Sequence, residues 1–173
     1  MKKVLILSVL MLAIMGIAYG VGRKTPDHTP AMEFDLDRYM GTWYEIARFD
    51  HSFERNMEQV TATYERISDD RIRVVNRGYD SRTGRWREAE GKAKPTDRPG
   101  RLRVSFFWIF YYDYDILELG PGYSWALVGS SSPRYLWILS RTPSLPKQTM
   151  DKILATARSY GYDTEKLIFV RQE

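Results

Sequence analysis

Hydrophobic and polar positions alternate along most of this chain, in short segments separated by clusters of Asp, Ser, Gly and Pro. A period of two residues is typical of a β-strand with one buried face, and the clusters supply the backbone angles that turns need. The segments that we expect to form strands are residues 42–50, 58–67, 71–79, 84–94, 101–107, 112–119, 122–130 and 134–141. Eight such strands with short loops predict an all-β fold, an eight-stranded up-and-down antiparallel β-barrel in which closure removes exposed edges.

One segment near the C-terminus has a helical period instead. The apolar positions that share one face of this helix are Met150, Ile153, Leu154 and Ala157. Ser144 is placed to cap the helix, Pro146 falls in its first turn and Gly161 lies just past its end. Segments 122–130 and 134–141 are apolar on both faces, so we expect this single C-terminal α-helix to pack outside the barrel over them. A short final strand follows the helix.

The alternation assigns one side chain in two to the inside of the barrel, where an eight-stranded barrel has room for one small ligand. The wall that we expect consists of Val60, Ala62, Tyr64, Val74, Asn76, Leu102, Val104, Phe106, Tyr114, Ile116, Leu127, Tyr135 and Trp137. This set is apolar and aromatic with few polar groups, which is typical of pockets for small molecules.

Two carboxyl groups are also expected on inward faces. Glu45 follows Trp43 by two positions, and Glu118 lies at the end of the segment 112–119. A buried carboxylate needs a hydrogen-bond partner or a proton. For Glu45 the contact with a polar ligand group or ordered water and the pairing with a neighbouring Tyr or Arg are equally good interpretations, whereas for Glu118 the pairing is favoured.

The densest aromatic stretch is "FFWIFYYDY", residues 106–114. Its central residues, Trp108 to Tyr111, are expected to form the loop between the segments 101–107 and 112–119, with Trp108 contributing to the ligand site. An exposed apolar loop marks an interaction site. Three uses are open: a lid over the ligand, a contact with a membrane, and a contact in a homodimer.

The N-terminus reads as an export signal. Lys2 and Lys3 precede an apolar run and small residues near Ala18 and Gly20, so residues 1–20 are expected to be a cleaved signal peptide, with an uncleaved anchor as the alternative. Residues 21–34 read as a flexible leader and residues 35–173 as one domain. The formal net charge of +4 includes no dense basic cluster, so no nucleic-acid partner is expected.

Little in the sequence favours catalysis. The chain has no Cys, which excludes disulfides and thiolate chemistry, and its two histidines are His28 in the leader and His51 in the loop after the first expected strand. No nucleophile elbow is present, and His51 is expected to be an exposed loop residue. We therefore expect a binding protein with no cofactor and no metal, and not an enzyme.

Three short motifs, in order, give the chain a family resemblance. They are Gly41-x-Trp43, then Gly122-Tyr123 at the start of the seventh strand, then Arg141-Thr142 at the end of the eighth. With eight strands and one late helix, the chain resembles the lipocalins, and "GTWYEIARFD", "VTATYERI", "VSFF" and "YLWILSRTP" look most like bacterial outer-membrane lipocalins, kin of apolipoprotein D. The resemblance implies that Trp43 lies across the closed floor of the barrel and that Arg141 packs over it, although Trp43 could also be the bottom of a ligand site.

The resemblance also implies a function and a place. The expected ligand is a fatty acid or a lysophospholipid, held for storage or transport in the bacterial envelope. Bacterial outer-membrane lipocalins usually carry a lipidated Cys after the signal sequence, and this chain has none, so we expect a periplasmic protein whose outer-membrane association would need another route. The alternatives are a lipocalin-fold enzyme acting on lipids and a filled barrel that serves as an interaction protein.

Overall fold

The barrel predicted from the alternation is present in the structure, a computed structural model that describes residues 31, 33–107 and 109–173. The strands are β1 (Gly41–Phe49), β2 (Met57–Ser68), β3 (Arg71–Asp80), β4 (Arg85–Pro95), β5 (Arg101–Phe107), β6 (Phe110–Leu119), β7 (Trp125–Gly129), β8 (Leu136–Ser140) and β9 (Leu167–Phe169). The expected signal peptide, most of the expected leader, His28 and Trp108 lie outside the described residues. Within the described part, no helix combines the length and the hydrophobicity needed to cross a bilayer.

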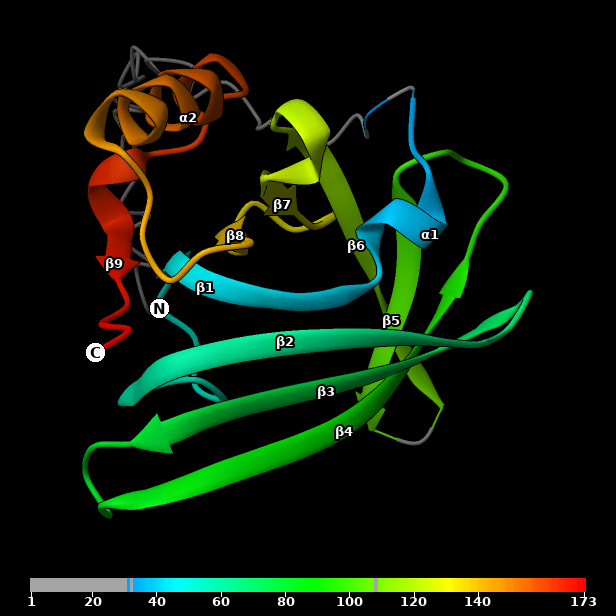
Figure 1. Ribbon diagram of the computed structural model, residues 1–173, viewed down its shortest axis with the longest axis horizontal. Helices are drawn as coiled ribbons and strands as arrows, with labels where there is room; N and C mark the ends of the chain where they lie inside the picture. The colour runs from blue at the N-terminus through cyan, green and yellow to red at the C-terminus, as the bar shows by residue number, and fades with distance from the viewer. Residues whose placement is uncertain (1–30, 32, 108) are drawn as a thin grey trace, which may run out of the picture.

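The sheet closes on itself. Its strands follow the order β2-β3-β4-β5-β6-β7-β8-β1-β9, and a further pairing of β1 with β2 completes the ring. All the pairings are antiparallel. In Figure 1 the long β2, β3 and β4 form one wall of the barrel, and the helix α2 (Lys147–Ser159) lies on the opposite side, near β7 and β8. The eight-stranded barrel, the outer helix and the short final strand are confirmed.

Strand pairing joins only the first part of β1 to β2. Residues Gly41–Tyr44 pair with Thr61–Tyr64, and beyond this point the two strands diverge. The C-terminal tail fills the gap, because the side-chain amide of Gln172 donates to the carbonyl oxygens of Glu45 (2.6 Å) and Val60 (3.1 Å). The last residues of the chain therefore complete the wall where its first two strands separate.

Helix α2 covers an outer face of the barrel, as the two-sided apolar strands predicted. Ile153 and Ala157 are fully buried against an outer cluster. The barrel residues of this cluster are Ile46, Ala47, Phe49, Leu117, Trp125, Leu127, Leu136 and Ile138. The predicted cap is wrong: α2 begins at Lys147 after Pro146, and no side chain caps it. Gly161 follows the helix with a φ of +95°, a left-handed conformation that favours glycine.

A short helix closes one end of the barrel. Asp35 caps α1 (Leu36–Tyr39) by accepting hydrogen bonds from the backbone N–H groups of Asp37 and Arg38. The chain then enters β1, so that Tyr39 is buried directly beside Trp43, with ring centroids 4.9 Å apart. This end is the floor, and α1 is visible there in Figure 1.

Candidate functional site

The floor is held by a single cation. The Arg141 guanidinium lies 3.7 Å from the centre of the Trp43 ring. It also donates hydrogen bonds to the carbonyl oxygens of Thr42 (3.0 Å), Arg38 (2.8 Å) and Tyr39 (3.1 Å). The indole N–H of Trp43 donates to the Tyr39 carbonyl as well, at 2.8 Å. The guanidinium therefore joins α1 and the start of β1 to the end of β8.

Gly41 and Tyr123 bring the backbone of the floor together. Gly41 has a φ of +93°, and a Cβ atom there would lie 3.4 Å from Arg141 Nη1. Gly122 and Tyr123 do not open β7, as the motif predicted, but form a 3₁₀ turn before it. From that turn the Tyr123 hydroxyl accepts a hydrogen bond from the Asp35 N–H at 2.7 Å, and the Arg38 guanidinium lies 4.3 Å from its ring centre.

Most of the expected wall faces the inside of the barrel. These inward residues are Val60, Ala62, Tyr64, Val74, Asn76, Leu102, Val104, Phe106, Tyr114, Ile116, Tyr135 and Trp137. Ala62, Asn76, Tyr114 and Trp137 remain partly exposed although they point inward. The interior above the floor is therefore accessible to solvent, and we call this space the cup.

Small residues on β4 give the cup its width. Ala89, Gly91 and Ala93 pair with inward residues of β3, so the three share the interior face. The Phe106 ring lies over Gly91, where a Cβ atom would approach it to 2.7 Å. A larger side chain at residue 91 would therefore displace this aromatic ring of the wall.

Three tyrosine hydroxyl groups meet at the lower end of the cup. The Tyr39 and Tyr114 hydroxyls are 2.7 Å apart, and the Tyr64 hydroxyl donates to that of Tyr114 at 2.9 Å. Burial raises the pKa of each of the three phenols, so all three are neutral. These hydroxyls form a polar point in a floor that is otherwise apolar.

The mouth end contains a buried ionic network. Arg48 Nη1 donates to Glu45 Oε1 at 2.7 Å, and Arg48 Nη2 donates to the Glu54 carbonyl at 2.6 Å. Trp137 Nε1 donates to Glu54 Oε2 at 3.2 Å. Burial, and then the charge of Glu54, raise the pKa of the Glu45 carboxyl well above its usual range. Glu45 is therefore paired with an Arg of its own strand, which was one of its two expected interpretations.

The first mouth loop folds inward over this network. His51 is only 7% exposed, so the expectation of an exposed loop histidine is wrong. Its ring stacks on Phe53 with centroids 3.9 Å apart, and Nε2 lies 2.9 Å from Glu54 Oε2. The loop docks because two of its side chains contact Trp137 of the barrel. The His51 and Trp137 ring centroids are 5.5 Å apart, and the Glu54 carboxylate accepts the hydrogen bond from Trp137 Nε1. Among the described residues, no group of three or more His, Asp or Glu side chains is suited to hold a metal ion.

Two expected inward residues face outward. Leu127 packs in the outer cluster under α2, opposite Ile138. A register shift between Ile116 and Glu118 turns Glu118 outward, where its carboxylate accepts a hydrogen bond from the Tyr160 hydroxyl at 3.4 Å. The two errors have different causes: β7 is apolar and covered on both faces, so alternation could not assign its phase, whereas the shift in β6 breaks the alternation that placed Glu118.

The turn between β5 and β6 and the first residues of β6 carry exposed apolar side chains. Ile109, Phe110 and Tyr112 are each at least 60% exposed. Beside them, the Lys94 ammonium lies 4.8 Å from the centre of the Tyr111 ring. Trp108, which we expected here as a ligand contact, lies outside the described residues.

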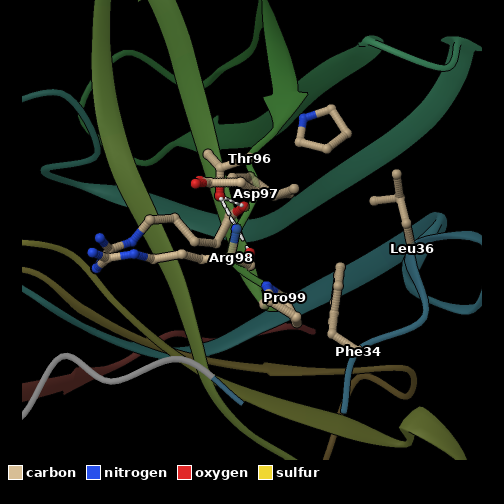
Figure 2. A pocket seen from close by; sticks show the side chains of 10 residues that line it. Phe34, Leu36, Thr96, Asp97, Arg98 and Pro99 are labelled. Atoms are coloured by element: carbon tan, nitrogen blue, oxygen red, sulfur yellow. Dashed lines mark hydrogen bonds between the residues drawn. The ribbon is translucent and has the colours of Figure 1, made fainter. Parts of the chain in front are cut away.

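A second hollow lies outside the floor. It has a volume of about 230 Å³ and is lined by the segment before α1 and the loop that joins β4 to β5. Figure 2 shows Phe34 and Leu36 on one side of it and Thr96–Pro99 on the other. Phe34 packs on Tyr39, with ring centroids 5.5 Å apart, so the floor separates this open depression from the cup.

The sequence analysis missed several groups of the cup and its mouth. The sequence analysis did not single out Tyr39 or Glu54, and it expected His51 to be an exposed loop residue. The small residues of β4 were detectable, because Ala89, Gly91 and Ala93 recur at every second position. No comparable signal marks Tyr39, whose position follows from the packing of α1 under the barrel.

Comparisons with known proteins agree with this geometry. The model of the lipocalin-like domain family matches residues 34–172. An outer membrane lipoprotein Blc from Vibrio cholerae is 47% identical over 149 residues, covering 83% of this chain and 86% of the relative. The Blc protein of Escherichia coli K12 is 48% identical over 146 residues, covering 83% and 82%. Apolipoprotein D of Mus musculus is 30% identical over 161 residues, covering 83% and 80%.

Solved structures share the fold at lower sequence identity. Insecticyanin from the tobacco hornworm superimposes with a TM-score of 0.69 at 21% identity, covering 84% of each chain. Lobster apocrustacyanin A1 gives 0.67 at 19% identity, covering 86% of this chain and 90% of that one.

Proposed function

This chain belongs to the family of lipocalin-like domains, and from that we propose that it binds a fatty acid or a lysophospholipid in the cup and stores or carries it in the bacterial envelope. The family and the Blc relatives support a protein that binds small hydrophobic ligands. The choice of lipid is our proposal. We also propose that the protein acts by binding and not by catalysis.

The observation that carries the proposal is the shape of the cup wall. The inner face combines small residues, Ala62, Ala89 and Gly91, with partly exposed aromatic rings, among them Tyr114 and Trp137. An acyl chain in this space would bury its methylenes, each contributing about 0.8 kcal/mol before the cost of immobilising the chain. Affinity in the micromolar range or better is therefore reasonable for a long-chain lipid.

The head group would remain at the mouth. Arg48 already donates to Glu45 and to the Glu54 carbonyl, and Arg55 pairs with Asp50 at the surface. Tyr112 lies near the opening with its side chain 66% exposed. A charged head group can stay hydrated there, which avoids the cost of burying it beside Glu45.

A variant that fills the cup tests the proposal. Ala62→Trp should weaken binding of hexadecanoic acid or a lysophospholipid more than tenfold, because the indole would occupy the space of the acyl chain. The matched control is Thr63→Trp on the adjacent outward position, where the Thr63 hydroxyl contacts that of Thr42 at 3.0 Å. Titration by calorimetry and Trp fluorescence measures both. Absence of binding to the wild type at high micromolar lipid, or equal binding by Ala62→Trp, would leave the filled barrel as the better account.

For location, we propose export to the periplasm after cleavage of residues 1–20, since these residues have the layout of a signal peptide. The apolar loop at Ile109 and Phe110 then has three candidate uses: a lid, a membrane contact and a homodimer contact. Co-sedimentation with lipid vesicles and the molecular mass in solution separate the last two. Absence of both effects would leave the lid.

A further inference from the structure

The lower end of the cup presents hydrogen-bonding groups where a plain acyl chain would place a methyl group. Tyr39, Tyr64 and Tyr114 reach this point from α1, β2 and β6. The Tyr114 hydroxyl lies between the other two, 2.7 Å from that of Tyr39 and 2.9 Å from that of Tyr64. Tyr39 and Tyr64 are almost fully buried, at 0% and 4% exposure, whereas Tyr114 is partly exposed. Tyr114 is therefore the member of the trio that a molecule in the cup can reach.

The trio has one donor more than it uses. Three phenols supply three O–H donors, and the two O···O contacts consume two of them. Because the Tyr64 hydroxyl donates to Tyr114, the remaining O–H belongs to Tyr114 or to Tyr39. The described residues show no further acceptor for it. A buried donor without an acceptor is costly, so this position favours an oxygen atom from outside the protein.

An acceptor without a donor lies one step nearer the mouth. On β3, Val74 is opposite Tyr64, and Asn76 is opposite Ala62. Because Val74 and Asn76 are two positions apart, Asn76 lies on the same inner face, one residue pair nearer the mouth than the trio. Its side-chain oxygen is buried and has no hydrogen-bond partner among the described residues. A hydroxyl group both accepts and donates, and it would suit a site that offers one donor and, above it, one acceptor.

The group that binds here should be uncharged. Burial raises the pKa of the Tyr64 phenol, as expected where a charged form loses its hydration. A carboxylate at the trio would have a single free O–H to replace the water that it gives up. The Arg141 guanidinium donates to the backbone carbonyls of Thr42, Arg38 and Tyr39 and to none of the three hydroxyls.

We propose that the cup is adapted to an oxygenated acyl ligand, whose head group stays at the mouth and whose far end carries a hydroxyl or carbonyl oxygen that binds at the Tyr39–Tyr64–Tyr114 trio. This inference rests on the proposed function and narrows it from lipids in general to acyl chains with a distal uncharged oxygen.

The test compares matched ligands that differ by one oxygen. Dodecanoic, tetradecanoic and hexadecanoic acids are titrated against their ω-hydroxy derivatives, so that one chain length places its terminal oxygen at the trio. For that length we expect the wild type to bind the ω-hydroxy acid about tenfold more tightly than the parent acid. Tyr114→Phe removes the reachable hydroxyl, and Tyr64→Phe combined with Tyr114→Phe leaves no pair of hydroxyls. Both variants should bind the parent acids at least as well as the wild type and should lose the preference for the hydroxylated ones.

The control is Tyr112→Phe, which removes a phenol oxygen at the mouth and should keep the preference. Denaturant midpoints of all the variants verify that the barrel is folded. If the wild type shows no preference at any chain length, or if the preference survives in both Tyr114 variants, the proposal is overturned and an ordered water satisfies the trio. In that case the broader lipid-binding function would still stand if the wild type binds hexadecanoic acid tightly and Ala62→Trp does not bind it.

Discussion

Replacing Arg141 by Ala tests whether one partly exposed cation holds the floor of the barrel. In the wild type this side chain stacks on Trp43 at 3.7 Å and donates to three backbone carbonyls that lie about a hundred positions earlier in the chain. The substitution removes all four interactions at once. It leaves the cup wall untouched, so the expected effect is on the free energy of unfolding and not on ligand affinity.

The magnitude follows from the surroundings of each contact. The carbonyls of Thr42 and Arg38 are at the surface, so water replaces the guanidinium there, and each lost bond costs about 0.5 to 1 kcal/mol. The Tyr39 carbonyl keeps its bond from the Trp43 indole. Loss of the cation–π contact adds about 0.5 to 1 kcal/mol for a partly exposed pair. The total is about 1.5 to 3 kcal/mol.

Urea unfolding followed by Trp fluorescence measures this loss. With a slope of about 2 kcal/mol per molar urea, the midpoint of Arg141→Ala should fall by about 1 M. Arg141→Lys keeps the charge but not the planar fork, so its midpoint should be intermediate. Arg134→Ala, at an exposed residue of the loop before β8, is the matched control and should be neutral. A midpoint of Arg141→Ala equal to that of the wild type would refute the account of the floor.

Two further predictions concern the mouth and the N-terminus. The raised pKa of Glu45 means that the folded state holds its proton more tightly than the unfolded state, so stability declines as pH rises from about 4.3 through the folded pKa. Glu45→Gln should flatten this decline, and urea midpoints with an unchanged pH slope would contradict it. The intact mass of the native protein should correspond to a chain beginning near Val21; a membrane-bound product that retains residues 1–20 would exclude cleavage.

The strands and the outer helix were predictable because their signals are local. Turn residues separate the strands, and Ile153 and Ala157 recur at helical spacing, so element type follows from period alone. The phase of β7 was not predictable in the same way. Ala126 and Leu127 are both fully buried, one inside the barrel and one under α2, and a pattern that is apolar on both faces contains no information about which is which.

The candidate site was predictable where it consists of alternating wall residues and not where it depends on loops. Tyr64 and Tyr114 follow from their strands, but Tyr39 joins them only because α1 folds under the barrel. Similarly, Glu54 belongs to a polar loop, and its burial beside Arg48 results from the docking of that loop on the barrel. Charge and hydropathy assign such residues to solvent, whereas tertiary packing buries them.

The tail that fills the seam between β1 and β2 has a consequence for how the chain folds. The bond from Gln172 to the Glu45 carbonyl spans 127 positions, and β1 also pairs with both β8 and β9. Contacts so distant along the chain give a high contact order, which is associated with folding in milliseconds to seconds and with cooperative closure. The part of β1 that does not pair with β2 is therefore among the last parts of the barrel to be secured, and until then its unpaired backbone edge is available for aggregation.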